Sequence, residues 1–173
     1  GRGAGGGGMG GRVWRWVRHA TTRGEAMGQV ESRIGLRAPA HNQADGTDLF
    51  AAIEARQQAG PLGAVFLDEA QFLNAGQVRD LARVVDDLGL PVLCYGLRTD
   101  FRGALFPGSA ELLALADHLR EVRTVCHCGR KATMNLRRQP DGRAIAEGEQ
   151  VAVEKSDYVS LCRKHFFEAL AGG

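Results

Sequence analysis

The segment that decides the fold, residues 64–95, reads AVFLDEAQFLNAGQVRDLARVVDDLGLPVLCY. Both of its ends are short apolar runs, which predict buried strands. Between them, apolar side chains recur at helical spacing, with Asn74 as a candidate N-cap and Gly89 as the stop. The apolar face of this helix consists of Val78, Leu81, Ala82, Val85 and Leu88. Two strands joined by a helix are expected to run parallel, with a right-handed crossover, in an α/β sheet.

Two more helices are predicted on either side of this segment. Upstream, Leu49, Phe50 and Ile53 fall at helical spacing after Asp48, and a Gly-Pro pair at residues 60–61 supplies the stop. Downstream, Ser109 is expected to cap a helix that continues to about residue 116. The pattern therefore extends the alternation of strands and helices in both directions.

The pattern changes after Glu121. Short strands are predicted over residues 122–126 and 132–137, followed by a Pro-Asp-Gly turn at residues 140–142 and a closing helix from about Ser160 to Leu170. We therefore predict an α/β core over residues 29–120 and a smaller β-rich subdomain over residues 121–173.

The composition is that of a globular protein, because 44% of the 173 residues are hydrophobic and 24% are charged. Residues 1–28 carry five arginines and one glutamate, so the remaining residues hold 17 basic and 19 acidic side chains, a net charge of −2. This balance disfavours nucleic acid as a partner. No apolar run is long enough to cross a bilayer, so no membrane partner is expected.

The glycine-rich start of the chain differs from the rest. Residues 1–12 are mostly glycine, and residues 13–28 show no clear helical or strand period. Such a segment has little side chain to bury against its backbone entropy. We interpret residues 1–28 as a disordered or non-native leader; a flexible arm that contacts phosphate groups is the alternative.

Four side chains have the spacing of metal ligands. Cys126 and Cys128 enclose one residue, Cys162 and His165 enclose two, and residues 129–161 separate the pairs. Three thiolates and one imidazole fill the tetrahedral shell of Zn²⁺ without an open position for water, so the predicted site is structural. Disulfides and unlinked core cysteines are the alternatives. Disulfides are disfavoured because the chain has a cytosolic character and Cys94 would be left without a sensible partner.

Two acids follow the first buried strand. Asp68 and Glu69 come directly after the apolar run at residues 64–67, at the end of a parallel sheet where ligands bind. One carboxylate there could hold Mg²⁺ through its water shell, and the other could take a proton from a substrate hydroxyl. Taken alone, a solvated strand end is an equally good interpretation.

Several motifs together closely resemble bacterial thymidine kinases of the tetrameric, zinc-containing type. They are LDEAQFL at residues 67–73, VLCYGLRTDFRG at residues 92–103 and the Cys-x-Cys…Cys-x-x-His set, with further agreement at residues 32–36, 129–132 and 147–150. The resemblance covers about Val30 to Leu170. It implies a P-loop-type α/β domain over residues 29–120 and a zinc-tied lasso over residues 121–173.

The resemblance also implies an activity and a site. The family transfers a phosphate from ATP, with Mg²⁺, to the 5′-hydroxyl of thymidine; it is cytoplasmic, homotetrameric and inhibited by thymidine triphosphate. Glu69 would be the general base, Asp68 would serve the magnesium–nucleotide side, and Gln71 belongs to the nucleotide-contacting segment. The positions that match the walls of the thymine pocket are Phe72, Leu97, Phe101, Phe106 and Tyr158. Ordinary core packing is the alternative for the phenylalanines.

The sequence departs from the family at the phosphate site. Family members carry an N-terminal G-x-x-x-x-G-K-[ST] motif, and residues 1–173 contain none. The glycine pair that usually precedes the lasso tyrosine is replaced by Glu154 and Lys155. We hypothesise that residues 1–28 stand in place of the first strand and phosphate loop, and we expect poor turnover from this chain. A catalytically silent nucleoside-binding relative and a zinc-ribbon interaction module are the alternatives.

Overall fold

The computed structural model describes residues 12–17, 29–31, 37–39, 41–42, 46–150 and 157–172; before residue 46, only His41 is described beyond its backbone. The described chain forms two compact units. The N-terminal unit holds the described residues up to Ala70, together with Ala75–Tyr95. The C-terminal unit contains Gln71–Asn74 and the chain from Gly96 onward.

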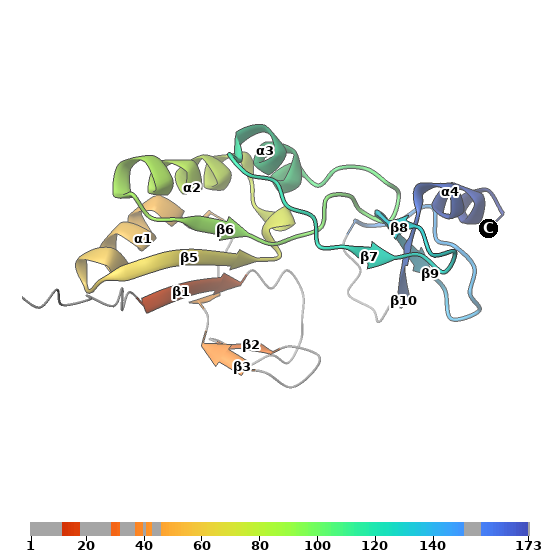
Figure 1. Cartoon of the computed structure of the whole chain (residues 1–173), viewed down its shortest axis with the longest axis horizontal. Coiled ribbons are helices and arrows are strands. Elements are labelled where there is room, and N and C mark those ends of the chain that lie inside the picture. Colours follow the sequence, from red (N-terminus) through yellow and green to blue (C-terminus); the bar gives the residue numbers. More distant parts are fainter. Residues whose placement is uncertain are drawn as a thin grey trace, which may run out of the picture. The chain divides into compact units, whose positions relative to one another are not determined.

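The N-terminal unit is built on a parallel sheet. Its strands follow the order β4-β1-β5-β6, and every neighbouring pair is parallel (Figure 1). A separate antiparallel hairpin consists of β2 and β3. The parallel α/β core predicted from the sequence is therefore confirmed. The bounds are Arg12–Val17 for β1, Gln29–Glu31 for β2, Arg37–Pro39 for β3, His41–Asn42 for β4, Leu62–Asp68 for β5 and Val92–Cys94 for β6.

Strand β1 corrects the interpretation of the leader. Its residues lie within the segment that we expected to lack regular structure, yet they pair with β4 on one side and β5 on the other. The register places Trp14 opposite Val65 and Trp16 opposite Leu67. The strand was missed because its residues, RVWRWV, follow no clear strand or helix period. Residues 1–11 and 18–28 lie outside the described part of the chain.

Helices α1 (Leu49–Gln58) and α2 (Ala75–Leu88) pack against each other (Figure 1). Helix α1 begins where Asp48 caps it, since Oδ1 accepts a hydrogen bond from the Ala51 N–H at 2.8 Å. Its residues Leu49 and Ile53 are fully buried. The Gln57 side chain donates to the carbonyl of Leu88 at 3.4 Å, which ties the two helices at their C-terminal ends.

The buried face of α2 differs by one position from the predicted one. Val78, Leu81 and Val84 are buried, whereas Val85 is 36% exposed. Apolar residues at both 84 and 85 fit the helical period, so spacing alone could not decide between them. The predicted stop is confirmed, because Gly89 follows α2 with φ of 64°.

Strand β6 is less buried than its apolar sequence predicts. It forms one edge of the described sheet, and Leu93 is 37% exposed. Strand β5 is central instead, with Val65 and Leu67 buried. The hydrogen bonds Tyr95 N–H to Leu67 O and Ala70 N–H to Tyr95 O, both at 2.8 Å, join the C-terminal ends of the two strands. They fix the backbone on both sides of residues 68 and 69.

The C-terminal unit is a β-rich subdomain with two helices. Strands β7 and β8 form one antiparallel pair, and β9 and β10 form another. Helix α4 contacts both β9 and β10 over a core that includes Met134, Leu161 and Phe166. The bounds are Ala70–Phe72 for the single turn η1 after β5, Pro107–Leu115 for α3, Thr124–Val125 for β7, Lys131–Ala132 for β8, Met134–Arg138 for β9, Asp157–Leu161 for β10 and Arg163–Ala171 for α4.

Both helices of this unit begin at a different residue from the predicted one. Helix α3 begins at Pro107, whose fixed φ suits a first helical position, and Ser109 lies inside its first turn. The Ser109 hydroxyl donates instead to the carbonyl of Leu97 at 2.6 Å. Helix α4 begins at Arg163, because Ser160 is still in strand β10.

The boundary between the units lies earlier than the expected one at residue 120. Residues 96–120, including α3, belong to the C-terminal unit. One reason is Gly103, with φ of 83°: a Cβ there would meet Met134 Cε at 3.2 Å and Phe166 Cε1 at 3.5 Å. The loop before α3 therefore rests directly on the β-rich core. None of the described helices is long and apolar enough to span a membrane.

Candidate functional site

Three cysteines and one histidine meet at one end of the C-terminal unit. Cys126 follows strand β7 and Cys128 lies in the turn toward β8. Cys162 is the N-cap of α4, and His165 lies in the first turn of that helix. The four ligand atoms all lie within 4.8 Å of one another. The hairpin and the helix start thus bring together two pairs that are distant in sequence, as the spacing predicts.

The separations between the ligand atoms fit a tetrahedral zinc shell. With ordinary Zn–S and Zn–N bond lengths, two sulfurs lie about 3.8 Å apart, and a sulfur and a nitrogen lie about 3.6 Å apart. Cys128 Sγ is 3.8 Å from Cys162 Sγ. His165 Nδ1 is 3.4 Å from Cys126 Sγ and 3.5 Å from Cys162 Sγ. The cluster can therefore hold Zn²⁺ with four protein ligands, which leaves no position open for a water nucleophile.

The local electrostatics favour a thiolate at Cys126. Burial raises the pKa of this thiol, but backbone N–H groups of Cys128 and Cys162 donate to the sulfur. Together with the side chains of His165 and Cys128, they lower the pKa of Cys126 to about 5. A cysteine binds metal as the thiolate, so one ligand is ready at neutral pH with little cost of deprotonation.

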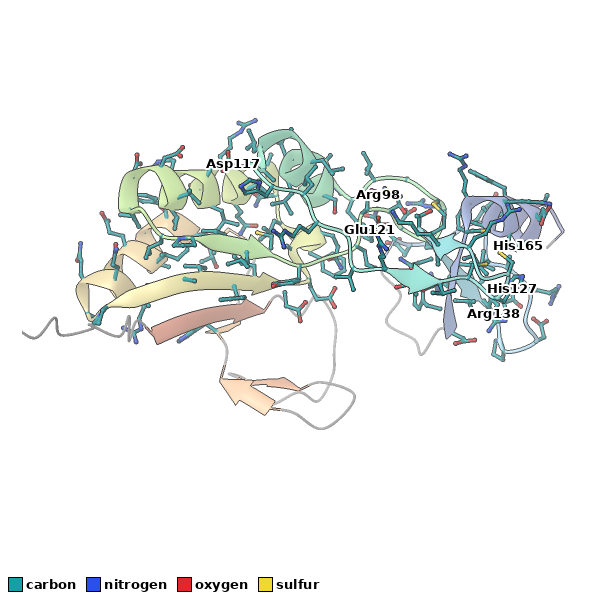
Figure 2. All side chains as sticks on the ribbon, in the orientation of Figure 1. Arg98, Asp117, Glu121, His127, Arg138 and His165 are labelled. Atoms are coloured by element: carbon teal, nitrogen blue, oxygen red, sulfur yellow. The ribbon has the colours of Figure 1, made fainter. Side chains whose placement is uncertain are left out.

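Two further side chains surround the His165 ligand. The His127 ring stacks on the His165 ring, with centroids 4.3 Å apart, and Figure 2 shows the two imidazoles side by side. Glu168 Oε2 lies 3.9 Å from His165 Nε2, the nitrogen that faces away from the sulfurs. The stacked ring restricts the orientation of the His165 imidazole, whereas 3.9 Å is too long for a hydrogen bond to Glu168.

The disulfide alternative for the cysteines does not match the structure. All four cysteines are free thiols, so the disulfide alternative is wrong. Cys94 lies in β6 of the N-terminal unit, and burial raises the pKa of its thiol to about 12. A thiol of this kind is an inert part of the packing rather than a ligand.

Asp68, the last residue of β5, and Glu69, which follows it, are both exposed. Glu69 has φ of 53° and is the one non-glycine residue with a positive φ in the described part of the chain. Its N–H donates to Asp68 Oδ1 at 3.0 Å. A left-handed backbone costs a glutamate free energy and turns its side chain away from the strand direction, and such strain is typical of functional sites.

Gln71 has a buried side chain that positions the backbone of Leu97. It is 1% exposed, and its Oε1 accepts a hydrogen bond from the Leu97 N–H at 3.1 Å. Since Ser109 donates to the Leu97 carbonyl, both polar groups of that peptide backbone are held by side chains. The side chain of Leu97 itself is 42% exposed.

The aromatic residues predicted to line a pocket occupy two kinds of environment. The rings of Phe72 and Phe106 meet edge to face, with centroids 5.6 Å apart. Phe101 is 2% exposed, and its ring lies 5.2 Å from the guanidinium of Arg137. Tyr158 is 49% exposed on β10, opposite Arg137 in the register with β9. The phenylalanines are thus packed, whereas Leu97 and Tyr158 offer apolar surface.

The comparisons with known proteins agree with these features. A family model described as thymidine kinase matches residues 15–166. The chain is 62% identical over 145 residues to a thymidine kinase of Jannaschia sp. (strain CCS1), which covers 83% of this chain and 74% of the relative. It is 61% identical over 143 residues to that of Ruegeria pomeroyi, and 54% identical over 145 residues to that of Yersinia pestis. The chain belongs to the thymidine kinase family.

The match to the family model includes part of strand β1. The thymidine kinase family model begins at residue 15, inside β1, and therefore before the start of the resemblance at Val30. This agrees with the position of β1 inside the sheet. The motif at residues 32–36 and the departure at residues 154–155 lie outside the described residues.

One buried acid, Asp100, was not predicted from the sequence. Asp100 is 2% exposed and accepts hydrogen bonds from Arg102 and Ala104. It also accepts one from Gln150, which lies in the family motif at residues 147–150. A buried carboxylate that accepts several hydrogen bonds holds the surrounding backbone in one conformation. The one signal available in the sequence was the charged Asp-Phe-Arg triplet at residues 100–102.

Proposed function

We propose that the chain transfers the γ-phosphate of ATP to the 5′-hydroxyl of thymidine, giving thymidine monophosphate and ADP in nucleoside salvage. Membership of the thymidine kinase family over residues 15–166 carries this proposal. High identity to thymidine kinases over most of the chain supports the same reaction and substrate.

Glu69 is the general base of the proposed reaction. Its carboxylate accepts the proton of the 5′-hydroxyl while the oxygen attacks the γ-phosphorus, and the bond from that phosphorus to the bridging oxygen of ADP breaks. The exposed position of Glu69 at the C-terminal end of β5 supports this role, since ligands of parallel sheets bind at that edge. Because its φ is 53°, the Glu69 side chain points in a different direction from the one that it would take in a continuing strand.

Asp68 serves the magnesium–ATP side of the reaction. It is exposed and directly precedes Glu69, so the two carboxylates can act on different reactants at one strand end. A carboxylate near Mg²⁺ holds the ion through its water shell and so helps to neutralise the charge of the phosphates.

The thymine base binds against the apolar residues of the C-terminal unit. Phe72, Phe101 and Phe106 supply packed rings, and Leu97 and Tyr158 supply exposed apolar surface. Gln71 supports the pocket by holding the Leu97 backbone. A flat, neutral pyrimidine suits such a slot with a few fixed polar groups.

Zinc has a structural role in this proposal. Cys126, Cys128, Cys162 and His165 hold it, and it ties the β7–β8 hairpin to the start of α4. The family also suggests a cytoplasmic homotetramer with thymidine triphosphate as feedback inhibitor, and we extend the proposal to these properties.

A calorimetric titration combined with product analysis tests the proposal. Thymidine is titrated into the protein with and without ATP and Mg²⁺, and the nucleotide products are separated after incubation. We expect saturable thymidine binding and slow formation of thymidine monophosphate together with ADP. Thymidine binding without any product would support the catalytically silent alternative, and absence of thymidine binding would overturn both.

A further inference from the structure

The loop at residues 97–106 is built around one buried carboxylate. Asp100 Oδ1 accepts hydrogen bonds from the backbone N–H groups of Arg102 and Ala104, both at 2.9 Å. Its Oδ2 accepts from Arg102 Nε at 3.0 Å, Arg102 Nη2 at 2.8 Å and Gln150 Nε2 at 3.2 Å. Five donors thus converge on a side chain with no exposed surface.

The backbone of the same loop is closed by its own hydrogen bonds. The Asp100 N–H donates to Ala104 O at 2.8 Å, and the Gly103 N–H donates to Asp100 O at 3.1 Å. Thr99 and Leu105 form an antiparallel bridge around this turn. The turn needs the positive φ of Gly103, and it lies against Met134 and Phe166. Asp100 is therefore the centre of a hydrogen-bonded turn that packs on the β-rich core of its own unit.

The loop carries three residues of the proposed thymine pocket. Leu97 and Phe106 stand at its two ends, and Phe101 directly follows Asp100. Phe106 is further linked to the loop by its N–H, which donates to Arg98 O at 3.4 Å. Any loosening of the turn at Asp100 would change the spacing of these side chains.

We propose that Asp100 is the positioning residue of the nucleoside-binding loop, and that Gln150 links this loop to the segment at residues 147–150. Asp100 acts through the backbone of the loop and not by contact with substrate. The inference rests on the proposed function, because that function makes Leu97, Phe101 and Phe106 pocket residues. Only the carboxylate itself is fully buried, and it accepts five hydrogen bonds, so its removal takes several contacts out of the turn at once.

The chain contains a matched control. Asp141 forms the same Asp-x-Arg arrangement, with the Arg143 N–H at 3.0 Å from Oδ1 and Arg143 Nε at 2.8 Å from Oδ2. Its side chain, however, is 50% exposed and lies in the turn after β9. Asp141→Ala thus removes an equivalent turn brace at a site that carries no proposed pocket residue.

The test compares Asp100→Ala, Gln150→Ala and Asp141→Ala by thymidine calorimetry, zinc analysis and amide hydrogen exchange. For Asp100→Ala we expect the thymidine Kd to rise about tenfold or more, with one zinc retained and with faster exchange at the Arg102 and Ala104 amides. Gln150→Ala leaves the turn itself intact, so it should fold and raise the Kd about threefold. Asp141→Ala should leave the Kd unchanged.

The outcomes separate this inference from the proposed function. A wild-type protein that does not bind thymidine overturns the proposed function and, with it, the role of the loop. Normal wild-type binding with an unchanged Kd in Asp100→Ala overturns the role of Asp100 alone. If Asp100→Ala does not fold, an unchanged Kd in Gln150→Ala overturns the link, and a raised Kd there supports it.

Discussion

The side chain of Gln71 accepts a hydrogen bond from the backbone N–H of Leu97 at 3.1 Å, across 26 residues of sequence. The Ser109 hydroxyl holds the carbonyl of the same residue at 2.6 Å. The family resemblance predicts that Gln71 contacts nucleotide, and the structure shows that Gln71 also supports the backbone of Leu97. It fixes the start of the loop that carries the proposed pocket.

Replacement of this amide should weaken both folding and thymidine binding. Gln71→Ala removes the partner of the Leu97 N–H in a partly buried place, so we expect a loss of about 0.5–1.5 kcal/mol in the free energy of unfolding. We also expect a raised thymidine Kd, because Leu97 loses its anchor. Urea unfolding and calorimetry measure the two effects.

Gln77 offers the control for this prediction. It is buried as well, at 3% exposure, and donates to Thr47 O at 3.4 Å within the N-terminal unit. Gln77→Ala should lower stability without a change in the thymidine Kd. Equal Kd values for Gln71→Ala and the wild type would show that the anchor has no role in binding.

Loss of one metal ligand should remove the zinc. Cys162→Ser replaces a thiolate by a poor ligand, and we expect the zinc content to fall from about one equivalent per chain to near zero. The β7–β8 hairpin and the start of α4 should then lose their amide protection. Cys94→Ala, in strand β6, is the control that should keep its zinc. Freshly prepared wild-type protein without zinc would contradict the assignment of the site.

The stability of the C-terminal unit should depend on the charge of Asp100. Burial raises the pKa of this carboxyl, but hydrogen bonds from Arg102, Ala104 and Gln150 outweigh burial and place the pKa below its usual value of 3.8. The ionised form is therefore favoured in the folded protein. Its contribution to stability is present above the unfolded pKa and is lost as the pH falls through the folded pKa.

A pH series of urea unfolding checks the sign of this effect. The difference in the free energy of unfolding between wild type and Asp100→Asn should be largest at pH 5 to 7 and should shrink as the pH falls below about 4. Loss of zinc at low pH affects both proteins alike and so cancels in the difference. A difference that grows toward low pH would contradict the assigned direction.

The backbone at Glu69 should carry strain that glycine relieves. At a φ of 53°, the left-handed backbone destabilises a residue with a Cβ by about 1 kcal/mol or more. Glycine adopts this conformation freely. Glu69→Ala and Glu69→Gly both remove the carboxylate, so both should lack activity. We expect the glycine variant to be about 0.5–1 kcal/mol more stable than the alanine variant in thermal unfolding. An alanine variant of equal or greater stability would show that the site is not strained.

The sequence predicted the features that depend on local pattern. The apolar runs at residues 64–67 and 91–95 predicted β5 and β6, and the ligand spacing predicted the Cys₃His cluster. Strand β1 was missed, because its sequence RVWRWV mixes two arginines with four apolar residues and shows no clear strand or helix period. Asp100 was missed, because its partner Gln150 lies 50 residues away and no local pattern connects them.

The conformation of Glu69 could not be predicted for a related reason. Asparagine or glycine signals a left-handed backbone, whereas glutamate carries no such signal. The hydrogen bonds that close β5 against Tyr95 impose the backbone course there, and they exist only in the folded sheet. The sequence thus identified Glu69 as a candidate through its place after an apolar strand and through the family motif.

The most direct test of the account is the rate of thymidine phosphorylation by Glu69→Gln. The amide keeps the shape of the side chain but cannot accept the 5′-hydroxyl proton as a base. We expect the rate of product formation to fall by about 10² or more, with the thymidine Kd within about twofold of wild type. Asp86→Asn, an exposed acid on α2, should keep the wild-type rate. A Glu69→Gln variant with the full wild-type rate would contradict the proposal that this carboxylate is the base.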